Sequence, residues 1–254
     1  MASHPHLHLS QAAQCLAHWC TVAQPSEALL YLSNGAAQLC LTHRGSDIEH
    51  RLPAGWQGLL CARSGLCLLE GTARVWPVAP SGLVKLQYFI DQGSCSTLGE
   101  QRGEPLGLLA APLACLYNRT VLEQWYLDQA VQAQAAYRAF AAALRYRESY
   151  RLVSFLSQQA TEEGTLGSMA QRYGVSVAHF RRLCHIALGA GGKSQLRDWR
   201  TATALLAVAD GPASLTEVAL NCGYASSSHF ARDIRQMLGV VPSSLIDITR
   251  LAAR

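Results

Sequence analysis

Three serines, a histidine and two arginines occur together in residues 223–242, GYASSSHFARDIRQMLGVVP. These side chains could bind nucleic acid, because serine and histidine can hydrogen-bond bases or phosphates and arginine can donate two bonds to a guanine edge. A similar stretch, YGVSVAHFRRLCHIALG, lies about fifty residues upstream, so that His179 corresponds to His229 and Arg182 to Arg232. The repeat predicts one small module that is used twice.

The surrounding residues predict that each copy is a short helix, a glycine-containing turn and a second helix. In the first copy Thr165 precedes the first helix, Gly174 ends it and Ser176 caps the second, VAHFRRLCHIAL. In the second copy Ser214 caps LTEVALNC, Gly223 ends it and the serine cluster opens SHFARDIRQML. The second helix of such a helix-turn-helix can lie in the major groove of DNA.

Helical periodicity divides each second helix into a buried face and an outward face. The residues predicted to be buried are Phe180, Leu183, Cys184 and Ala187 in the first copy and Phe230, Ile234, Met237 and Leu238 in the second. The outward residues, which we predict to bind DNA, are Ala178, His179, Arg181, Arg182, Ser227, Ser228, His229, Arg232 and Arg235. For either copy alone, a solvated helical hairpin would explain the arginines equally well. Two copies at matched spacing favour DNA binding.

A third helical segment, SQLRDWRTATALLAVAD, joins the two copies and places Leu196, Trp199, Thr203 and Leu206 on one face, where we expect packing against the modules. About sixteen helical residues span roughly 24 Å at ~1.5 Å per residue. With the offset of the flanking helices, both second helices could lie near the ~34 Å of one DNA turn. One molecule would then bind two successive faces of the major groove.

The distribution of charge agrees with a phosphate-facing C-terminal half. The 254 residues carry a formal net charge of +4, with thirteen Lys and Arg against eight Asp and Glu from Arg145 onward and eight against nine before it. Nine cysteines, without a Cys-x-x-Cys pair, indicate reduced and mostly buried thiols, and we interpret Cys61 and Cys67 as core residues. We find neither an export signal nor a long apolar run, which predicts a cytoplasmic protein without a membrane partner.

Residues 1–118 alternate short apolar runs with turn signals, for example EALLYLSNGAAQLCLTHRGSD and LVKLQYFIDQG, and therefore predict a β-rich domain. From Asn118 onward a stretch rich in Ala, Leu and Gln, capped by Thr120, is long enough for two helices. We predict an α+β protein with two domains. Residues 1–145 form a β-rich, then helical, regulatory and partner-binding domain, and residues 146–254 an all-α DNA-binding domain of seven helices, with two helix-turn-helix motifs joined by a linker helix.

Nothing in the sequence indicates catalysis or a cofactor. On a strand, His4, His6 and His8 would share one face and invite a metal, but no carboxylate or cysteine lies beside them, and a frayed terminus is the alternative. We find no glycine-rich phosphate loop, nucleophile elbow or paired catalytic carboxylates. We therefore predict that the chain is not an enzyme and holds no metal.

The stretch LTEVALNCGYASSSHFARDIRQMLGVVP resembles the signature of the AraC/XylS family of bacterial transcription regulators. The matching residues are Ala219, Gly223, Tyr224, Ser228, Phe230, Arg232, Arg235, Gly239 and Pro242, and the resemblance covers about residues 147–250. It implies that Ala178, Arg181, Arg182, Ser227, Ser228, His229 and Arg232 face DNA, with Ser228 also a candidate helix cap. It implies structural roles for Ala170, Gly174, Ala219 and Gly223. The sequence departs from the pattern at Ala225, Val241 and Ile246, which puts family DNA contacts there in doubt.

Within the family, ESYRLVSFLSQQ, YGVSVAHFRRLC, KSQLRDWR and SSLIDITRLA most resemble the InvF-type activators of type III secretion genes. This resemblance implies a virulence activator that binds double-stranded promoter DNA and RNA polymerase, and also pairs as a homodimer. It further implies a coactivator, the type III secretion chaperone of the translocator proteins, which is released when its cargo leaves. We expect the contact surface to include exposed residues among Trp125, Tyr126 and Tyr137, with core packing as the alternative.

Two other functions are weighed against this one. Many AraC-type regulators carry a β-rich domain that binds a small-molecule effector, and residues 1–118 do not decide between such an effector and a protein coactivator. A repair enzyme that transfers alkyl groups and carries an AraC-like half would need a zinc-held cysteine cluster. The cysteine spacing here does not provide that cluster.

Overall fold

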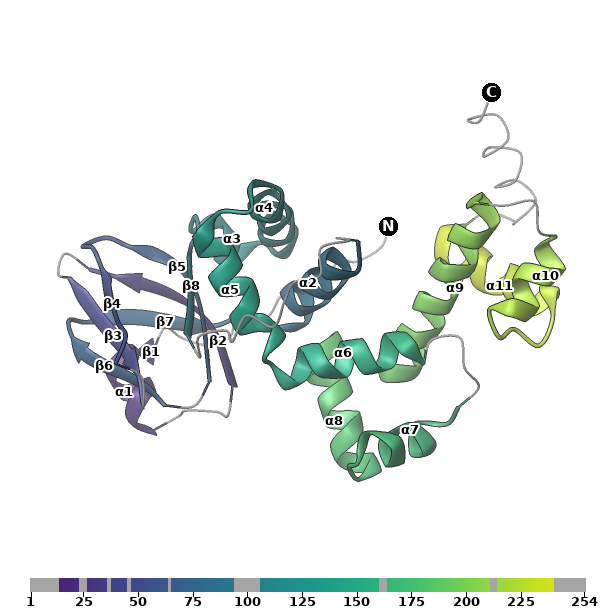
Figure 1. Ribbon diagram of the computed structural model, residues 1–254, viewed down its shortest axis with the longest axis horizontal. Helices are drawn as coiled ribbons and strands as arrows, with labels where there is room; N and C mark the ends of the chain where they lie inside the picture. The colour runs from purple at the N-terminus through teal and green to yellow at the C-terminus, as the bar shows by residue number, and fades with distance from the viewer. Residues whose placement is uncertain are drawn as a thin grey trace. The chain divides into compact units, whose positions relative to one another are not determined.

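The computed structural model, drawn in Figure 1, describes residues 14–22, 27–35, 38–44, 47–63, 65–93, 106–159, 164–210 and 214–239. The chain divides into two compact units, residues 1–151 and 152–254. The predicted domain boundary after residue 145 stays a prediction. His4, His6 and His8 lie outside the described residues.

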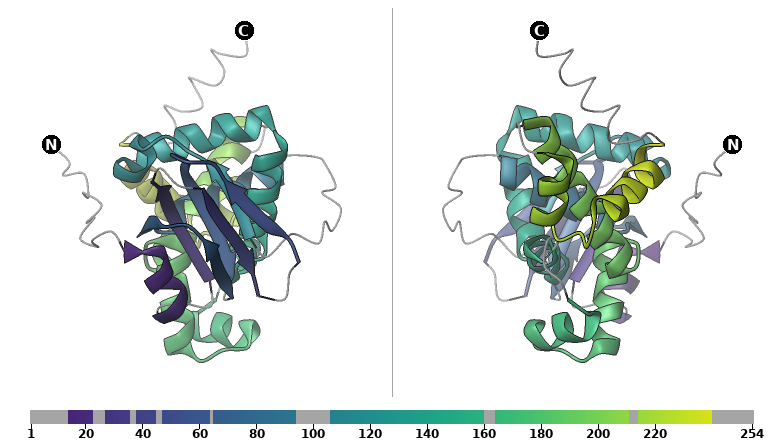
Figure 2. Two further views of the ribbon diagram at one scale, coloured as in Figure 1. Left: turned by 90° about the vertical axis from the view of Figure 1, so that its left-hand side faces the viewer. Right: turned by 90° about the vertical axis from the view of Figure 1, so that its right-hand side faces the viewer.

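The N-terminal unit contains two antiparallel sheets (Figures 1 and 2). The five-stranded sheet has the order β1 (Gln14–Cys15), β7 (Ala73–Pro77), β2 (Glu27–Asn34), β5 (Gln57–Arg63) and β8 (Leu106–Ala110). The three-stranded sheet has the order β4 (Glu49–Leu52), β3 (Leu39–His43) and β6 (Leu66–Glu70). Strand β2 pairs with β5 in the register Leu30 to Leu60, and β5 pairs with β8 in the register Leu60 to Leu108.

A hydrophobic core lies between the two sheets. Alternate strand residues point to the same face of a sheet, and Leu30 and Leu32 of β2 meet Leu39 and Leu41 of β3 in one buried cluster. Residues of β5, β7 and β8 from the large sheet and of β4 and β6 from the small sheet also belong to it, together with Leu16. Burial of these apolar side chains is the main stabilising contribution to this unit. The prediction of a β-rich N-terminal region is confirmed.

Helix α5 (Ala135–Arg145) packs on β5 and β8 of the large sheet. Helix α2 (Ser81–Gly93) packs on α5 and on α4 (Arg119–Gln132), and α3 (Ala114–Tyr117) packs on α4, while α1 (Leu16–Val22) packs beside β6 and β7. Helix α5 crosses β8 at Gly107, where an added Cβ would lie 2.8 Å from Ala143 Cβ and 2.9 Å from Phe140 Cα. Glycine is therefore needed at this crossing, because a side chain would push the helix away from the strand.

Three details of this unit differ from the sequence predictions. The run LVKLQYFIDQG, predicted among the strands, forms most of α2. The segment after Asn118 forms three helices, α4, α5 and α6 (Glu148–Gln158), not two, because Ala133 adopts a left-handed conformation with φ 48° and ends α4. The cap of α4 is Asn118, whose side-chain oxygen accepts the N–H groups of Thr120 and Val121, so the prediction of Thr120 as the cap was wrong.

The C-terminal unit is helical throughout its described part. It contains the second half of α6, then α7 (Leu166–Tyr173), α8 (Val177–Leu188), α9 (Gly192–Asp210), α10 (Leu215–Asn221) and α11 (Ser227–Leu238). The predicted all-α C-terminal part with two helix-turn-helix motifs and a linker helix is confirmed, whereas a seventh helix would fall outside the described residues. Among the described residues, no helix is both long and apolar enough to cross a membrane.

Candidate DNA interface

The first helix-turn-helix consists of α7 and α8. Thr165 caps α7 in a capping box, since its hydroxyl accepts the Ser168 N–H at 3.1 Å and its own N–H donates to Ser168 Oγ at 3.1 Å. Gly174, with φ 81°, ends α7 in the left-handed region that favours glycine. Ser176 Oγ accepts the His179 N–H at 3.3 Å and starts α8. The caps predicted here from local sequence are confirmed.

The second motif, α10 and α11, has the same local design. Ser214 and Glu217 form a capping box, with Ser214 N–H donating to Glu217 Oε2 at 2.8 Å, and this hydrogen bond holds the pKa of Glu217 below its ordinary value. Ser226 Oγ accepts the His229 N–H at 3.2 Å and is the cap of α11. Ser228 is therefore not the cap.

The two turns differ by one residue. Val175 N–H donates to Ala170 O at 3.0 Å, and Tyr224 N–H donates to Ala219 O at 2.9 Å, so Val175 and Tyr224 occupy equivalent places. In the first motif the cap residue follows directly, whereas in the second Ala225 intervenes before the cap. The second motif therefore carries a large aromatic ring at a place where the first has a small aliphatic side chain.

Aromatic rings pack against the buried face of the second helix of each motif, α8 and α11. Phe155 of α6 lies with its ring centroid 5.0 Å from Tyr173 and 6.2 Å from Phe180, and all three contact one another under α8. Under α11, the ring of Tyr224 lies 5.1 Å from Phe230. Ala170 and Ala219 are both fully buried, as predicted, because only a small side chain fits where two helices cross this closely.

The connecting helix α9 packs on both motifs. At its start, an added Cβ on Gly192 would lie 3.2 Å from Cys184 Sγ and 3.3 Å from Leu166 Cδ2. Farther along, Ala204 and Val208 join the buried cluster of α10 and α11. Nineteen residues of helix span about 28 Å at ~1.5 Å per residue.

The predicted buried face of α9 is correct at the start of the helix, where Leu196 is buried and Trp199 half-buried, and wrong farther along. Leu206 is 65% exposed and Thr203 is exposed, whereas Thr201 and Ala204 are buried. The Thr201 hydroxyl donates to Arg197 O at 2.9 Å and forms a 2.8 Å hydrogen bond with the Tyr224 hydroxyl. A threonine and an alanine can therefore line the close contact, while the larger Leu206 faces outward.

The nine predicted DNA-binding residues lie as follows. Ala178, Arg181 and Arg182 on α8 and Ser228, Arg232 and Arg235 on α11 are exposed, and His179, Ser227 and His229 are half-buried. Among the residues predicted to be buried, Phe180, Cys184, Ala187, Phe230 and Ile234 are buried and Leu183 is half-buried. Met237 and Leu238 are 38% and 47% exposed, which corrects their assignment to the core; both lie in the last turn of α11, beyond its buried cluster.

The two matched histidines have different contacts. Arg182 Nη2 lies 2.7 Å from His179 Nδ1, one helical turn away on α8. The ring of His229 instead meets the Tyr224 ring edge-on, with centroids 5.4 Å apart at 84°. Sequence reasoning also missed Arg200 of α9, whose guanidinium lies 5.8 Å from the Tyr224 ring centroid and whose Nη1 donates to Gly223 O at 3.4 Å. Its position 24 residues from Tyr224 in sequence gives no local signal.

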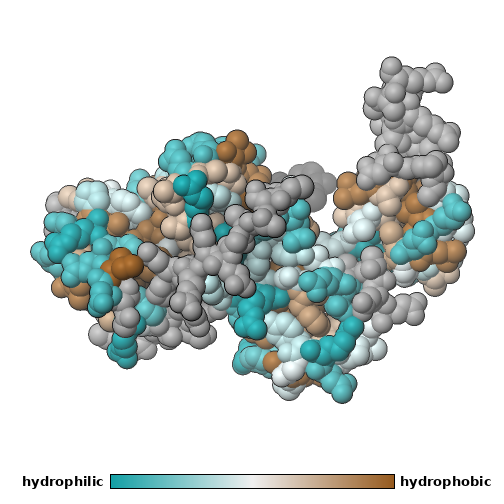
Figure 3. Space-filling model, in the orientation of Figure 1, coloured by the Kyte–Doolittle hydropathy of each residue, from teal (hydrophilic) through white to brown (hydrophobic). Residues whose placement is uncertain are grey.

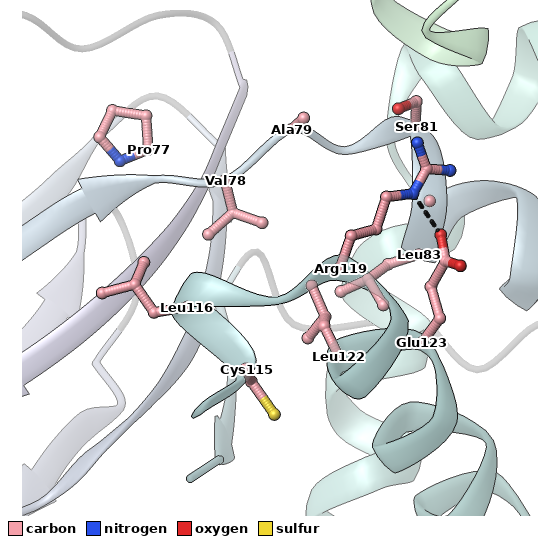
Figure 4. A pocket seen from close by; sticks show the side chains of 11 residues that line it. Pro77, Val78, Ala79, Ser81, Leu83, Cys115, Leu116, Arg119, Leu122 and Glu123 are labelled. Atoms are coloured by element: carbon pink, nitrogen blue, oxygen red, sulfur yellow. Dashed lines mark hydrogen bonds and ion pairs between the residues drawn. The ribbon is translucent and has the colours of Figure 1, made fainter. Parts of the chain in front are cut away.

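A small pocket lies in the N-terminal unit, where the end of β7 meets α2, α3 and α4 (Figure 4). Its volume is about 60 Å³, and its walls are mainly apolar, with the ion pair between Arg119 and Glu123 at one side. A more open and more polar hollow of about 540 Å³ lies beside β1, β2 and β7. Among the described residues, no cluster of three His, Cys, Asp or Glu could hold a metal ion.

Comparisons with known proteins relate the chain to transcription regulators. The helix-turn-helix domain family matches residues 169–247. The Invasion protein InvF of Salmonella typhimurium is 36% identical over 195 residues, which cover 76% of this chain and 90% of InvF. The transcriptional regulator MxiE of Shigella flexneri is 42% identical over 115 residues, which cover 44% of this chain and 55% of MxiE.

Among solved structures, the DNA-binding domain of AdpA in complex with a target DNA is 22% identical, with a TM-score of 0.39 over 41% of this chain and 94% of that one. Because this TM-score is low, the family assignment depends on the sequence relatives. InvF and MxiE belong to a family of non-enzymatic regulators, which confirms the prediction that the chain is not an enzyme. InvF aligns with about three quarters of this chain, and the C-terminal unit of the chain contains two helix-turn-helix motifs. The chain therefore belongs to the AraC/XylS family of DNA-binding transcription regulators.

Proposed function

We propose that this protein activates type III secretion and virulence genes by binding promoter DNA with α8 and α11 and engaging RNA polymerase in the cytoplasm. The observation that carries the proposal is the presence of two helices, each capped at its N-terminus and each presenting an exposed arginine at the same place, Arg182 and Arg232. The names of the relatives support the gene class, since they include an invasion protein and the virulence regulon transcriptional activator VirF of Yersinia enterocolitica.

We propose the nine outward residues as the DNA-contacting set. The N-terminal half of the second helix of a helix-turn-helix contacts base edges, and Ala178, His179, Arg181 and Arg182 lie in the first six residues of α8. Ser227, Ser228, His229 and Arg232 lie in the first six residues of α11, with Arg235 one turn farther on. Arginine can fork onto guanine, and the serine hydroxyls can donate or accept.

The proposed activation also depends on a protein coactivator, the type III secretion chaperone, bound to the N-terminal unit. The expected contact surface has to be revised, because Tyr126 and Tyr137 are 0% and 5% exposed and both donate to Gln87 Oε1. Exposed apolar residues of α4 are Leu127 and Val131, and Figure 3 shows apolar surface in the region of this helix. We also propose that two copies of this chain form a homodimer.

The alternative is a small-molecule effector bound by the N-terminal unit. Ligand pockets for drug-sized molecules are commonly about 300 to 1,000 Å³ and mostly apolar. The apolar pocket beside α4 holds only about 60 Å³, and the hollow of about 540 Å³ has this size but is more open and more polar than that pocket. The small volume of the enclosed apolar pocket favours a protein coactivator, and the open hollow is the place where a small effector would have to bind. A thermal-shift screen against metabolites tests the alternative, which a specific stabilisation of several degrees would support.

The decisive experiment maps the DNA bound by the full chain in its host. We expect promoters of secretion genes, and we expect the double variant Arg182→Ala, Arg232→Ala to lose them. Binding at unrelated promoters would overturn the assignment to secretion genes. A reporter strain that holds the protein and one bound promoter, with or without the chaperone, tests the coactivator, and full activation without the chaperone would refute it.

A further inference from the structure

The contact between His179 and Arg182 defines the protonation of the histidine ring. An arginine guanidinium carries only donors and stays protonated. Because Arg182 Nη2 lies 2.7 Å from His179 Nδ1, the arginine must donate and Nδ1 must accept. A neutral imidazole has one donor and one acceptor, so the remaining ring proton is on Nε2. The pair therefore presents His179 Nε2–H and the other guanidinium N–H groups, all of them donors.

The second motif lacks this pair, although it has the same residues at the same spacing. The His229 ring packs edge-on against Tyr224, which is 3% exposed and hydrogen-bonded to Thr201. Among the described residues, the Arg232 side chain has no hydrogen bond or ion pair. Val175 occupies the place of Tyr224 in the first motif, so the ring that holds His229 has no counterpart at that position, and the His179 imidazole meets Arg182 instead.

A surface that presents only donors favours particular bases. In the major groove guanine presents two acceptors, N7 and O6, whereas adenine and cytosine each present an amino donor. A donor-only pair can satisfy both guanine acceptors and meets an amino group with no acceptor. The hydroxyl of Ser228 on α11 can accept as well as donate, so the second motif does not carry the same restriction.

We infer that His179 is a specificity-determining residue: it orients Arg182 by accepting one of its N–H groups, and the resulting donor-only pair selects a guanine in the half-site bound by α8. This inference rests on the proposed function and adds the base class that the first motif reads. His179 acts mainly as a positioning residue, because Arg182 makes the principal base contact. His229 contributes to the packing of α11 and does not orient Arg232.

The test uses the full chain and a DNA sequence selected by it from a random duplex library, at fixed pH and salt. Each guanine of the selected sequence is replaced in turn by 7-deazaguanine, which lacks the N7 acceptor. For the wild-type protein we expect one replacement in the first half-site to weaken binding about tenfold or more. For Arg182→Ala we expect the same replacement to change binding less than about twofold, because the donor to N7 is gone.

Variants of His179 test whether its acceptor atom orients Arg182. His179→Ala should lower the effect of that one replacement to about threefold, and His179→Asn should restore most of it, because the amide oxygen lies near the place of Nδ1 and can accept. His179→Ala should have no further effect on this preference once Arg182 is Ala. The pair His229→Ala and Arg232→Ala is the matched control and should be additive. His185→Ala, an exposed histidine farther along α8, should leave the preference unchanged.

Three results would overturn the inference. The first is a guanine preference that His179→Ala leaves intact, and the second is additive losses from His179→Ala and Arg182→Ala. The third is equal weakening at every position and on random DNA, which would place Arg182 on a phosphate. These results leave sequence-specific binding in place, whereas failure to select any sequence would refute the proposed function together with this inference.

Discussion

Arg145 and Asp91 meet as a two-point ion pair in the N-terminal unit, with Nη2 2.7 Å from Oδ1 and Nε 2.8 Å from Oδ2. The Tyr150 hydroxyl donates to the same carboxylate at 2.6 Å, and Gln87 Nε2 donates at 2.8 Å. Asp91 of α2 thus joins the end of α5 to the first turn of α6. A carboxylate that receives four donors is satisfied even where it is largely shielded from water.

Asp91→Asn should destabilise the protein, because it removes the charge opposite a guanidinium that is only 26% exposed. We expect a loss of about 2 to 3 kcal/mol in the free energy of unfolding, since breaking a fully buried pair costs about 3 to 5 kcal/mol. Urea unfolding of the full chain measures it. The control is Glu49→Gln, which breaks the exposed pair of Arg51 and Glu49 and should cost much less, because water screens it. Equal losses would mean that the Asp91 pair contributes no more than a surface pair.

Acid should weaken the same pair. Burial acts to raise the pKa of Asp91, but the hydrogen bonds from Arg145 and Tyr150 outweigh it and hold the pKa below its ordinary value. The stabilisation is therefore fully present above the ordinary carboxyl pKa of about 4 and is lost as the pH falls through the lower, folded-state pKa. The stability difference between wild type and Asp91→Asn should shrink as the pH falls below about 4. A difference independent of pH would contradict this assignment.

Local signals in the sequence predicted the C-terminal unit well. Caps such as Thr165 and Ser214 act on N–H groups three residues away, so the sequence itself contains both partners of each bond. The Asp91 cluster could not be predicted this way, because Asp91 and Tyr150 lie 59 residues apart and meet only in the folded unit. The left-handed Ala133 that ends α4 also gives no signal, since alanine normally favours continuation of a helix.

The exposed side chains of the candidate interface could be predicted from periodicity, but their pairing could not. The repeat aligned His179 with His229, and only the extra turn residue Ala225, with Tyr224 before it, explains why their contacts differ. The buried face of α9 beyond its start was misjudged for a related reason. The small Ala204 and the hydrogen-bonded Thr201 are buried there, whereas the more apolar Leu206 is exposed.

Two glycines of α7 should respond to alanine in opposite directions. Gly174 has φ 81°, so Gly174→Ala forces a left-handed alanine and should cost about 1 to 2 kcal/mol, although no atom lies within 4 Å of the added Cβ. Gly167 lies inside the helix without a positive φ, and Gly167→Ala should stabilise the protein by about 0.5 to 1 kcal/mol. Thermal unfolding of both variants measures the two changes in stability. Stabilisation by Gly174→Ala would contradict the left-handed turn.

The hydrogen bond between Tyr224 and Thr201 should couple α9 to the second motif. Thr201 already donates to Arg197 O, so the Tyr224 hydroxyl donates to Thr201 Oγ1. Tyr224→Phe should cost about 1 kcal/mol, and Thr201→Val more, because it leaves the buried hydroxyl of Tyr224 without an acceptor. The double variant should lose less than the sum of the two. Additive losses in this double-mutant cycle would show that the two hydroxyls do not interact.

Arg182→Ala and Arg232→Ala should each weaken binding to the cognate promoter by about 1 to 3 kcal/mol, because each removes a two-point donor from a base edge. Binding to random DNA should fall less, and the specificity ratio should fall with it. The control is Arg51→Ala, which removes an exposed cation of β4 in the N-terminal unit and should leave both affinities unchanged. Titrations at several salt concentrations distinguish base contacts from phosphate contacts, because the loss of a phosphate contact lowers the salt slope by about one and weakens all sequences alike. If both variants bound the promoter as tightly as the wild type, α8 and α11 could not be the helices that read it.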